Sequence, residues 1–223
     1  MKIAAYTIFG ISILISILHL IFCFLENERL RKITKVFCVS SLALAIALYS
    51  PKSYLIYIGA AFGALGDYFL IYKKNTRLLF YGIISFFIGH CLYASQIIIY
   101  MQMPNWGIIL LAILEIILII SSLWGIYPKK EAKFSSTAGP GIAYFVLLGS
   151  MLVFSIVSSI VTMAIYPAIL YILGYVIFLS SDITLTITSY DKIVKRDNFY
   201  IMLTYLVAQY LITIGLVLTC LPL

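Results

Sequence analysis

The sequence is poor in charged residues, histidines and cysteines. Only 10% of its 223 residues are charged, 64% are hydrophobic, and the mean hydropathy is +1.12. A soluble domain carries about 25% charged residues, so this composition indicates an integral membrane protein. The cysteines show neither a CxxC spacing nor the pattern of a secreted disulfide framework. We therefore expect free thiols that pack between helices at Cys23, Cys38, Cys91 and Cys220.

Motifs for metal and cofactor binding are also missing. The chain has 2 histidines and no paired cysteines, whereas a zinc hydrolase normally uses about three protein ligands. It has no Gly-x-Ser-x-Gly nucleophile elbow, no P-loop and no dinucleotide-binding fingerprint. We therefore expect no metal and no cofactor.

Long apolar runs make up most of the chain. A helix of about 20 apolar residues crosses a bilayer, and the runs predict an all-α fold, a bundle of eight transmembrane helices in a single domain over residues 1–223. The first run is longer than the apolar region of a signal peptide, so we expect it to remain as the first helix. The predicted spans are 3–25, 33–49, 53–72, 78–100, 106–126, 138–160, 164–188 and 198–220.

Basic residues are concentrated in alternate connections. Cytoplasmic loops collect Lys and Arg, and 13 of the 15 basic residues follow the first, third, fifth and seventh predicted helices. Both termini are therefore predicted to be non-cytoplasmic, with only Lys2 and Lys52 on their side. Because these charges orient helices, the net charge of +7 does not indicate a nucleic-acid partner. The cytoplasmic set is Arg29, Arg31, Lys32, Lys35, Lys73, Lys74, Arg77, Lys129, Lys130, Lys133, Lys192, Lys195 and Arg196.

Two aspartates interrupt the apolar runs, Asp67 in the third predicted helix and Asp182 in the seventh. An ionised side chain in hydrocarbon costs at least ~2.5–3.5 kcal/mol, so such residues usually face the bundle interior and mark a functional site. Both helices run in the same direction, and each acid is predicted to lie roughly 9–14 Å from the cytoplasmic boundary. A structural explanation stays open, because Asp67 follows a Gly59-xxx-Gly63 repeat and could hydrogen-bond across a close helix contact.

Other polar residues inside the predicted helices share faces with one another. Tyr205 and Gln209 are one turn apart on the eighth helix, and Tyr93 follows His90 by one turn on the fourth. Both pairs are also compatible with interhelical hydrogen bonding alone, and the sequence leaves open whether Glu115 faces a cavity. The side chains expected to converge on one cavity in the cytoplasmic half are Asp67, Asp182, Tyr205, His90 and Tyr144.

Five ordered segments resemble the YhhN/TMEM86 family of eight-helix membrane proteins, which includes the lysoplasmalogenases. The resemblance covers most of the chain, and it is the order of the segments that makes it specific. One departure is Val36, where the family usually has a proline. The segments are ITKV at 33–36, GALGDYFLIY at 63–72, FFIGHCLY at 86–93, YVIFLSSDITL at 175–185 and MLTYLVAQYLI at 202–212.

The resemblance implies hydrolysis of the vinyl ether bond of a lysoplasmalogen to a fatty aldehyde and glycerophosphoethanolamine or glycerophosphocholine. A neutral carboxylic acid can protonate the β carbon, and an ionised carboxylate can stabilise the oxocarbenium ion and activate water. Asp67 and Asp182 are predicted to fill these two roles, in an order that the sequence leaves open. Lys35 is expected at the headgroup phosphate. The residues expected to position the water or the ether oxygen are His90, Tyr93, Tyr144, Tyr205 and Gln209.

The implied partners are the lysophospholipid substrate and membrane lipids, in a bacterial inner membrane or, in a eukaryote, the endoplasmic reticulum membrane. The alternative function is a non-enzymatic transporter or binding protein for lipids or small molecules, in which the acids form a coupling or gating site. Broken helices at the midplane would favour transport. The sequence shows none clearly, since Pro140 and Pro167 fall near helix ends.

Overall fold

Every element that the structure describes is an α-helix. The structure is a computed structural model, and it describes residues 2–72, 75–101, 138–161, 164–190 and 196–220, with the isolated positions 106, 109 and 113. This part of the chain contains no strand. Its seven helices are α1 (Lys2–Phe24), α2 (Glu28–Tyr49), α3 (Tyr54–Leu70), α4 (Thr76–Met101), α6 (Ala138–Val161), α7 (Ile165–Tyr190) and α8 (Asp197–Thr219).

The lengths and hydropathies of the helices agree with a polytopic membrane protein. Five of the described helices are long and apolar enough to cross a membrane, namely α1, α2, α4, α7 and α8. Shorter apolar helical stretches lie at Tyr54–Leu70 and Phe145–Ile160. The helix predicted at 106–126 lies almost wholly outside the described residues, so a count of eight stays a prediction.

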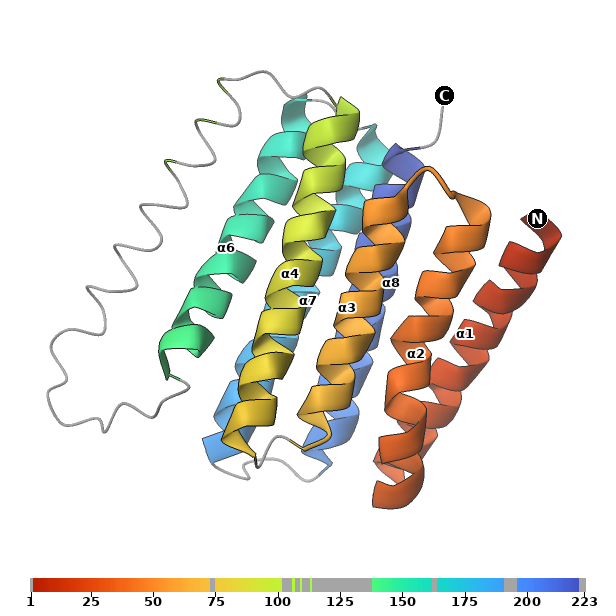
Figure 1. The fold of residues 1–223 in the computed structure, drawn as a ribbon, viewed down its shortest axis with the longest axis vertical. Coiled ribbons are helices and arrows are strands. Elements are labelled where there is room, and N and C mark those ends of the chain that lie inside the picture. The colour runs from red at the N-terminus through yellow and green to blue at the C-terminus, as the bar shows by residue number, and fades with distance from the viewer. Residues whose placement is uncertain are drawn as a thin grey trace, which may run out of the picture.

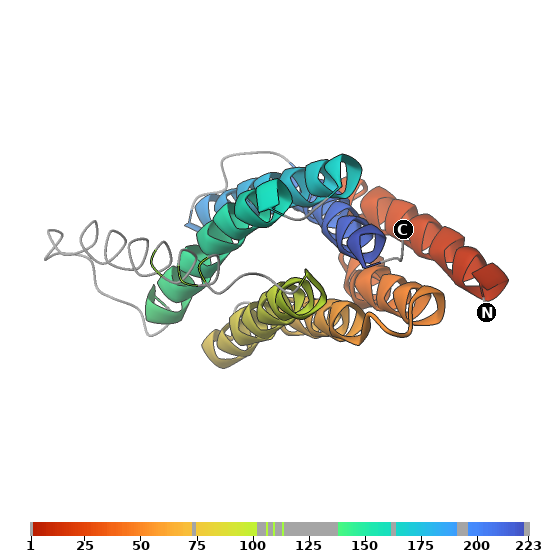
Figure 2. The ribbon, with the colours of Figure 1, turned by 90° about the horizontal axis from the view of Figure 1, so that it is seen from above.

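The helices form two layers with α1 at one side. Viewed along the bundle, α2, α3 and α4 lie in one row and α6, α7 and α8 in the other (Figure 2). Neighbours in sequence pack as antiparallel pairs within each row, and α8 also contacts α1, α2 and α3. The middle of the bundle is therefore the place where side chains of α3 and α8 meet across the two rows.

The two aspartate-bearing helices, α3 and α7, run in the same direction, as predicted (Figure 1). The first residues of α1 and the last residues of α8 lie at the same end of the bundle (Figure 1). Helix α4 ends near that same end, whereas α6 begins at the opposite one (Figure 1). That the termini are non-cytoplasmic stays a prediction.

The start of the second helix was predicted wrongly. Helix α2 begins at Glu28 and not at residue 33, because the Asn27 side chain caps it by accepting a hydrogen bond from the Leu30 backbone N–H at 3.2 Å. Three basic residues expected in the preceding loop therefore lie on the first turns of α2, and the helix passes through Val36 without interruption. The residues moved from loop to helix are Arg29, Arg31 and Lys32.

Glycines set close contacts within two of the antiparallel pairs, α3 with α4 and α7 with α8. A Cβ on Gly59 of α3 would lie 2.6 Å from the Tyr93 ring and 2.9 Å from the Gly89 carbonyl oxygen of α4. A Cβ on Gly174 of α7 would lie 2.6 Å from the Ile212 side chain and 2.9 Å from the Ile212 backbone nitrogen of α8. Neither position accepts a larger residue unless the backbones separate, so these glycines fix how α3 meets α4 and how α7 meets α8.

Candidate functional site

Asp67 is the centre of a buried ionic site between three helices. It lies on α3 and is only 2% exposed. Lys35 of α2 places its Nζ 3.4 Å from Asp67 Oδ1, and the Tyr205 hydroxyl of α8 donates a hydrogen bond to Asp67 Oδ2 at 2.8 Å. Both oxygens of the carboxylate therefore have a partner, which is the usual condition for a charge buried in a protein.

The residue before Asp67 is a glycine for a steric reason. A Cβ on Gly66 would lie 2.7 Å from the Phe86 ring of α4. The Phe86 ring packs edge-on against Tyr205, with 6.0 Å between ring centroids, and the Phe178 ring of α7 packs against the same tyrosine at 5.6 Å. Tyr205 is thus held between two rings while its hydroxyl reaches Asp67.

His90 lies in an aromatic environment beside this cluster. It is 2% exposed, and its Nδ1 is 3.2 Å from the Tyr175 hydroxyl of α7. The ring of Phe178 packs edge-on against His90 at 4.8 Å and that of Tyr93 at 5.8 Å. Phe178 contacts both His90 and Tyr205, so it joins the histidine to the Asp67 site.

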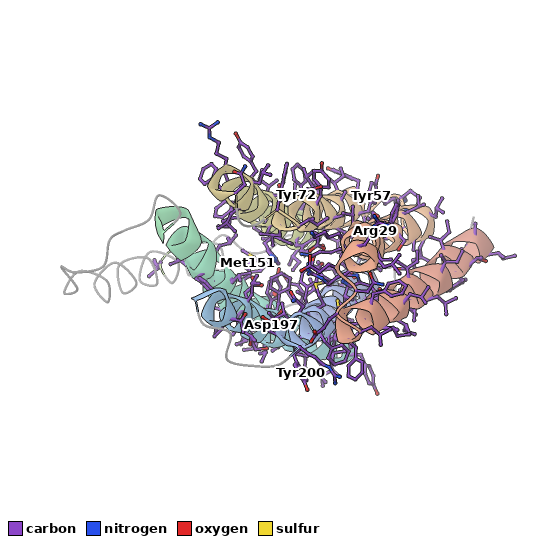
Figure 3. The ribbon with its side chains drawn as sticks, turned by 90° about the horizontal axis from the view of Figure 1, so that it is seen from below. Arg29, Tyr57, Tyr72, Met151, Asp197 and Tyr200 are labelled. Atoms are coloured by element: carbon purple, nitrogen blue, oxygen red, sulfur yellow. The ribbon has the colours of Figure 1, made fainter. Side chains whose placement is uncertain are left out.

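Gln209 and Tyr93 are two further residues of the predicted site, and they contact each other. The Tyr93 hydroxyl donates to Gln209 Oε1 at 3.4 Å, which links α4 to α8. Gln209 is one turn after Tyr205, and Gly63 of α3 faces both, since a Cβ there would lie 3.8 Å from Gln209 Nε2 and 3.9 Å from the Tyr205 hydroxyl. Seen from the end where α2 and α8 begin, side chains of the two rows fill the space between them (Figure 3).

Asp182 is buried on the face of α7 that carries the aromatic residues. It is 8% exposed and follows the fully buried Phe178 by one turn. The preceding Ser181 donates its hydroxyl to the Ile201 carbonyl of α8 at 3.0 Å. Asp182 comes eight residues after Gly174, where α7 packs closely on α8. Asp67 likewise comes eight residues after Gly59, where α3 packs closely on α4. Each acid therefore lies just over two turns beyond a close glycine contact of its helix.

The remaining sequence predictions have mixed outcomes. The side chain of Tyr144 and all of Glu115 lie outside the described residues. Lys35 was expected at a headgroup phosphate, and its ammonium lies against Asp67. Whether it also reaches a phosphate stays a prediction.

One polar network was not recognised from the sequence. Thr34 donates its hydroxyl to the Leu30 carbonyl at 2.8 Å, so it accepts from His19 Nδ1, which is also 2.8 Å away. This leaves His19 Nε2 as the acceptor facing the Cys23 thiol at 3.5 Å. The spacing of His19 and Cys23 by four residues was the available signal. These bonds join α1 to α2 and require no ligand.

The described ranges offer no cluster of metal-ligating side chains. No group of three or more His, Cys, Asp or Glu side chains there could hold a metal ion. Asp67, for example, has a lysine as its ion-pair partner and a tyrosine as its hydrogen-bond donor.

The helical fold and the ionic site between α2, α3 and α8 define a polytopic membrane protein with a polar centre in its apolar interior. The chain belongs to the YhhN family, whose model matches residues 28–216, and the resemblance read from the sequence is confirmed. The lysoplasmalogenase TMEM86A of Bos taurus is 26% identical over 196 residues, which cover 85% of this chain and 78% of that protein. No solved structure matches the chain.

Proposed function

We propose that the protein is a lysoplasmalogenase-like hydrolase that cleaves the vinyl ether bond of a lysoplasmalogen. The observation that carries the proposal is the Asp67 carboxylate, buried in the bundle with Lys35 and Tyr205 as partners. Membership of the YhhN family and the similarity to a lysoplasmalogenase support it. The products are a fatty aldehyde and glycerophosphoethanolamine or glycerophosphocholine.

The reaction consumes one water and needs an acid and a carboxylate. Protonation of the vinyl ether at its β carbon gives an oxocarbenium ion, water adds to the adjacent carbon, and the resulting hemiacetal collapses to aldehyde and alcohol. Asp67 already faces an ammonium and accepts a hydrogen bond. We therefore assign it the role of the carboxylate that stabilises the cation and takes the proton from water.

Asp182 is then the proton donor. It lies on the same face of α7 as Phe178, whose ring contacts Tyr205 of the Asp67 site. The region between α3 and α7, the helices that carry the two acids, is lined by Tyr205 and Gln209 of α8 and by His90 and Tyr93 of α4. These four side chains orient the water and the ether oxygen. Tyr144 is proposed to join this group.

The membrane arrangement follows from the distribution of charge. Six of the eight basic residues in the described part of the chain precede or begin α2, α4 or α8, and these three helices begin at one end of the bundle (Figure 1). The six are Arg29, Arg31, Lys32, Lys35, Arg77 and Arg196, whereas Lys2 and Lys52 begin α1 and precede α3 at the other end. We propose that this end is cytoplasmic, with eight crossings, both termini on the other side, and the alkenyl chain among the apolar helices. The membrane is then the bacterial inner membrane or the endoplasmic reticulum membrane.

The test is release of fatty aldehyde by purified protein from 1-alkenyl-lysophosphatidylethanolamine and 1-alkenyl-lysophosphatidylcholine. Asp67→Asn and Asp182→Asn are each expected to abolish release. An ester-linked lysophospholipid of the same chain length is expected to be a poor substrate, because it lacks the vinyl ether double bond whose β carbon is protonated. Lipid binding without turnover by the wild-type protein would overturn the proposal in favour of a transporter or binding protein. Full activity in both variants would overturn the roles assigned to the two aspartates.

A further inference from the structure

The basic residues at the start of α2 have different partners. Lys35 pairs with Asp67, and Lys32 pairs with Glu28 at 3.3 Å. Arg29 is exposed, whereas Arg31 is partly buried. Within the described ranges, no carboxylate lies within ion-pair distance of Arg31.

Arg31 is directed towards α8, and the partner it finds there is neutral. Its Nη1 donates to Asn198 Oδ1 at 3.3 Å. The Asn198 amide is oriented by Asp197, whose Oδ1 accepts from the Asn198 backbone N–H at 2.7 Å and from Nδ2 at 3.1 Å. A guanidinium has five N–H donors in a planar fork, so one bond to an amide leaves donors and the positive charge available to an anion.

The contact between Arg31 and Asn198 lies next to the Asp67 site and nearer the end of the bundle. Arg31 is four residues before Lys35 on α2, and Asn198 is seven residues before Tyr205 on α8. Residues at these spacings share a helix face. Arg31 is therefore about 6 Å, or one turn, from Lys35 along the axis of α2, on the side of the basic end.

We propose that Arg31, with Asn198, binds the phosphate of the lysoplasmalogen headgroup, while Lys35 remains the partner of Asp67. This inference rests on the proposed function. In the substrate, three glycerol carbons and one ester oxygen separate the ether oxygen from phosphorus, a length close to one helical turn, ~6 Å. With the vinyl ether at Asp67, the phosphate reaches the level of Arg31, and guanidinium binds phosphate through two parallel hydrogen bonds.

Two substrates that differ only in the phosphoethanolamine headgroup separate this inference from the proposed function. They are 1-alkenyl-lysophosphatidylethanolamine and the 1-alkenylglycerol of the same chain. Arg31→Gln is expected to raise KM for the phospholipid about 10- to 100-fold, the loss expected for a charged hydrogen bond, and to change kcat little. KM and kcat for the alkenylglycerol are expected to stay as in wild type.

Matched variants complete the design. Arg29→Gln removes the same charge from the same end of α2 and is expected to leave both substrates unaffected. Arg31→Lys is expected to restore part of the KM for the phospholipid, since an ammonium keeps the charge and loses the fork. Asp67→Asn is expected to abolish turnover of both substrates, which reports on the proposed function and not on Arg31.

Binding can be measured without turnover. The saturated 1-alkyl-lysophospholipid and 1-alkylglycerol cannot undergo vinyl ether hydrolysis, and their affinities for wild type and Arg31→Gln are compared by calorimetry. Weaker binding of the phospholipid alone supports the inference even if the protein proves inactive. Equal losses for both ligands, no loss for either, or no preference of the wild type for the phospholipid would overturn it.

Discussion

Lys35 of α2 and Asp67 of α3 form an ion pair, 3.4 Å between Nζ and Oδ1, inside an otherwise apolar bundle. Their side chains are 13% and 3% exposed. The hydroxyl of Tyr205, on α8, donates a hydrogen bond to the second oxygen of the Asp67 carboxylate. Because the pair is enclosed, loss of one member leaves the other charge buried without compensation.

We predict that the ion pair gives a characteristic double-mutant cycle. Asp67→Asn and Lys35→Met alone each leave an uncompensated charge and are expected to destabilise the protein by about 3–5 kcal/mol. The double variant removes both charges and is expected to recover most of this loss while remaining inactive. Thermal or denaturant unfolding in detergent measures the cycle.

The exposed pair of Lys32 and Glu28, on the same helix, is the control for that cycle. Its removal is expected to change stability by no more than about 1 kcal/mol. Additive effects of Asp67→Asn and Lys35→Met would contradict the interpretation of the pair as coupled.

Tyr205→Phe is predicted to reduce activity with a small effect on folding. The substitution removes the hydrogen bond to Asp67 and keeps the ring between Phe86 and Phe178. A bond to a charged group contributes about 1.5–3 kcal/mol, so a 10- to 100-fold fall in aldehyde release is expected. Tyr210→Phe is the control, because the Tyr210 hydroxyl hydrogen-bonds to Ser12 and Ser16 of α1 and not to Asp67. Equal losses of activity in the two variants would argue against a specific role for Tyr205.

Two glycines of α3 are predicted to respond differently to alanine. Gly59→Ala places a methyl group 2.9 Å from the Gly89 carbonyl, so α3 and α4 must separate and the melting temperature is expected to fall. Gly63→Ala places it 3.7 Å or more from every neighbour, which is ordinary van der Waals contact. Melting temperatures in the same detergent compare the two, and a Gly59→Ala variant as stable as Gly63→Ala would disprove the close contact.

The fate of the transferred proton provides a test of mechanism. If protonation occurs at the β carbon, hydrolysis in D₂O is expected to yield aldehyde carrying one deuterium on the carbon next to the carbonyl. Mass spectrometry of the trapped aldehyde measures this deuterium. The control for exchange is unlabelled aldehyde incubated in D₂O together with the Asp182→Asn protein. Aldehyde from wild type with no more deuterium than the control would rule out protonation at carbon.

Membrane orientation is predicted from the ends of the helices. In sealed vesicles of known sidedness, a cysteine at Lys52 is expected to react with an impermeant thiol reagent from the non-cytoplasmic side. A cysteine at Lys32 is expected to react from the cytoplasmic side. Labelling of the protein without an added cysteine gives the background, since Cys23, Cys38 and Cys220 are buried and Cys91 is partly exposed. The reverse pattern would overturn the orientation.

The helices could be located from sequence because hydropathy depends on composition along the chain. Six of the seven described helices begin within two residues of their predicted positions. The exception is α2, whose first turns are charged, so the apolar pattern starts later than the helix does. There the Asn27 cap decides the start, and its contribution is local hydrogen bonding that hydropathy does not register.

The sequence by itself determined the class of protein, the positions of Asp67 and Asp182 in parallel helices, and the end of the bundle that carries positive charge. These properties follow from hydropathy, charge and helical rise, which need no knowledge of neighbouring helices. Only the tertiary structure decided which cation Asp67 meets. Arg31 and Lys35 lie on the same face of α2, one turn apart, and the packing of α2 on α3 and α8 places Lys35 at the carboxylate and Arg31 at Asn198. That choice depends on the rotation and height of one helix against another, which side-chain contacts set.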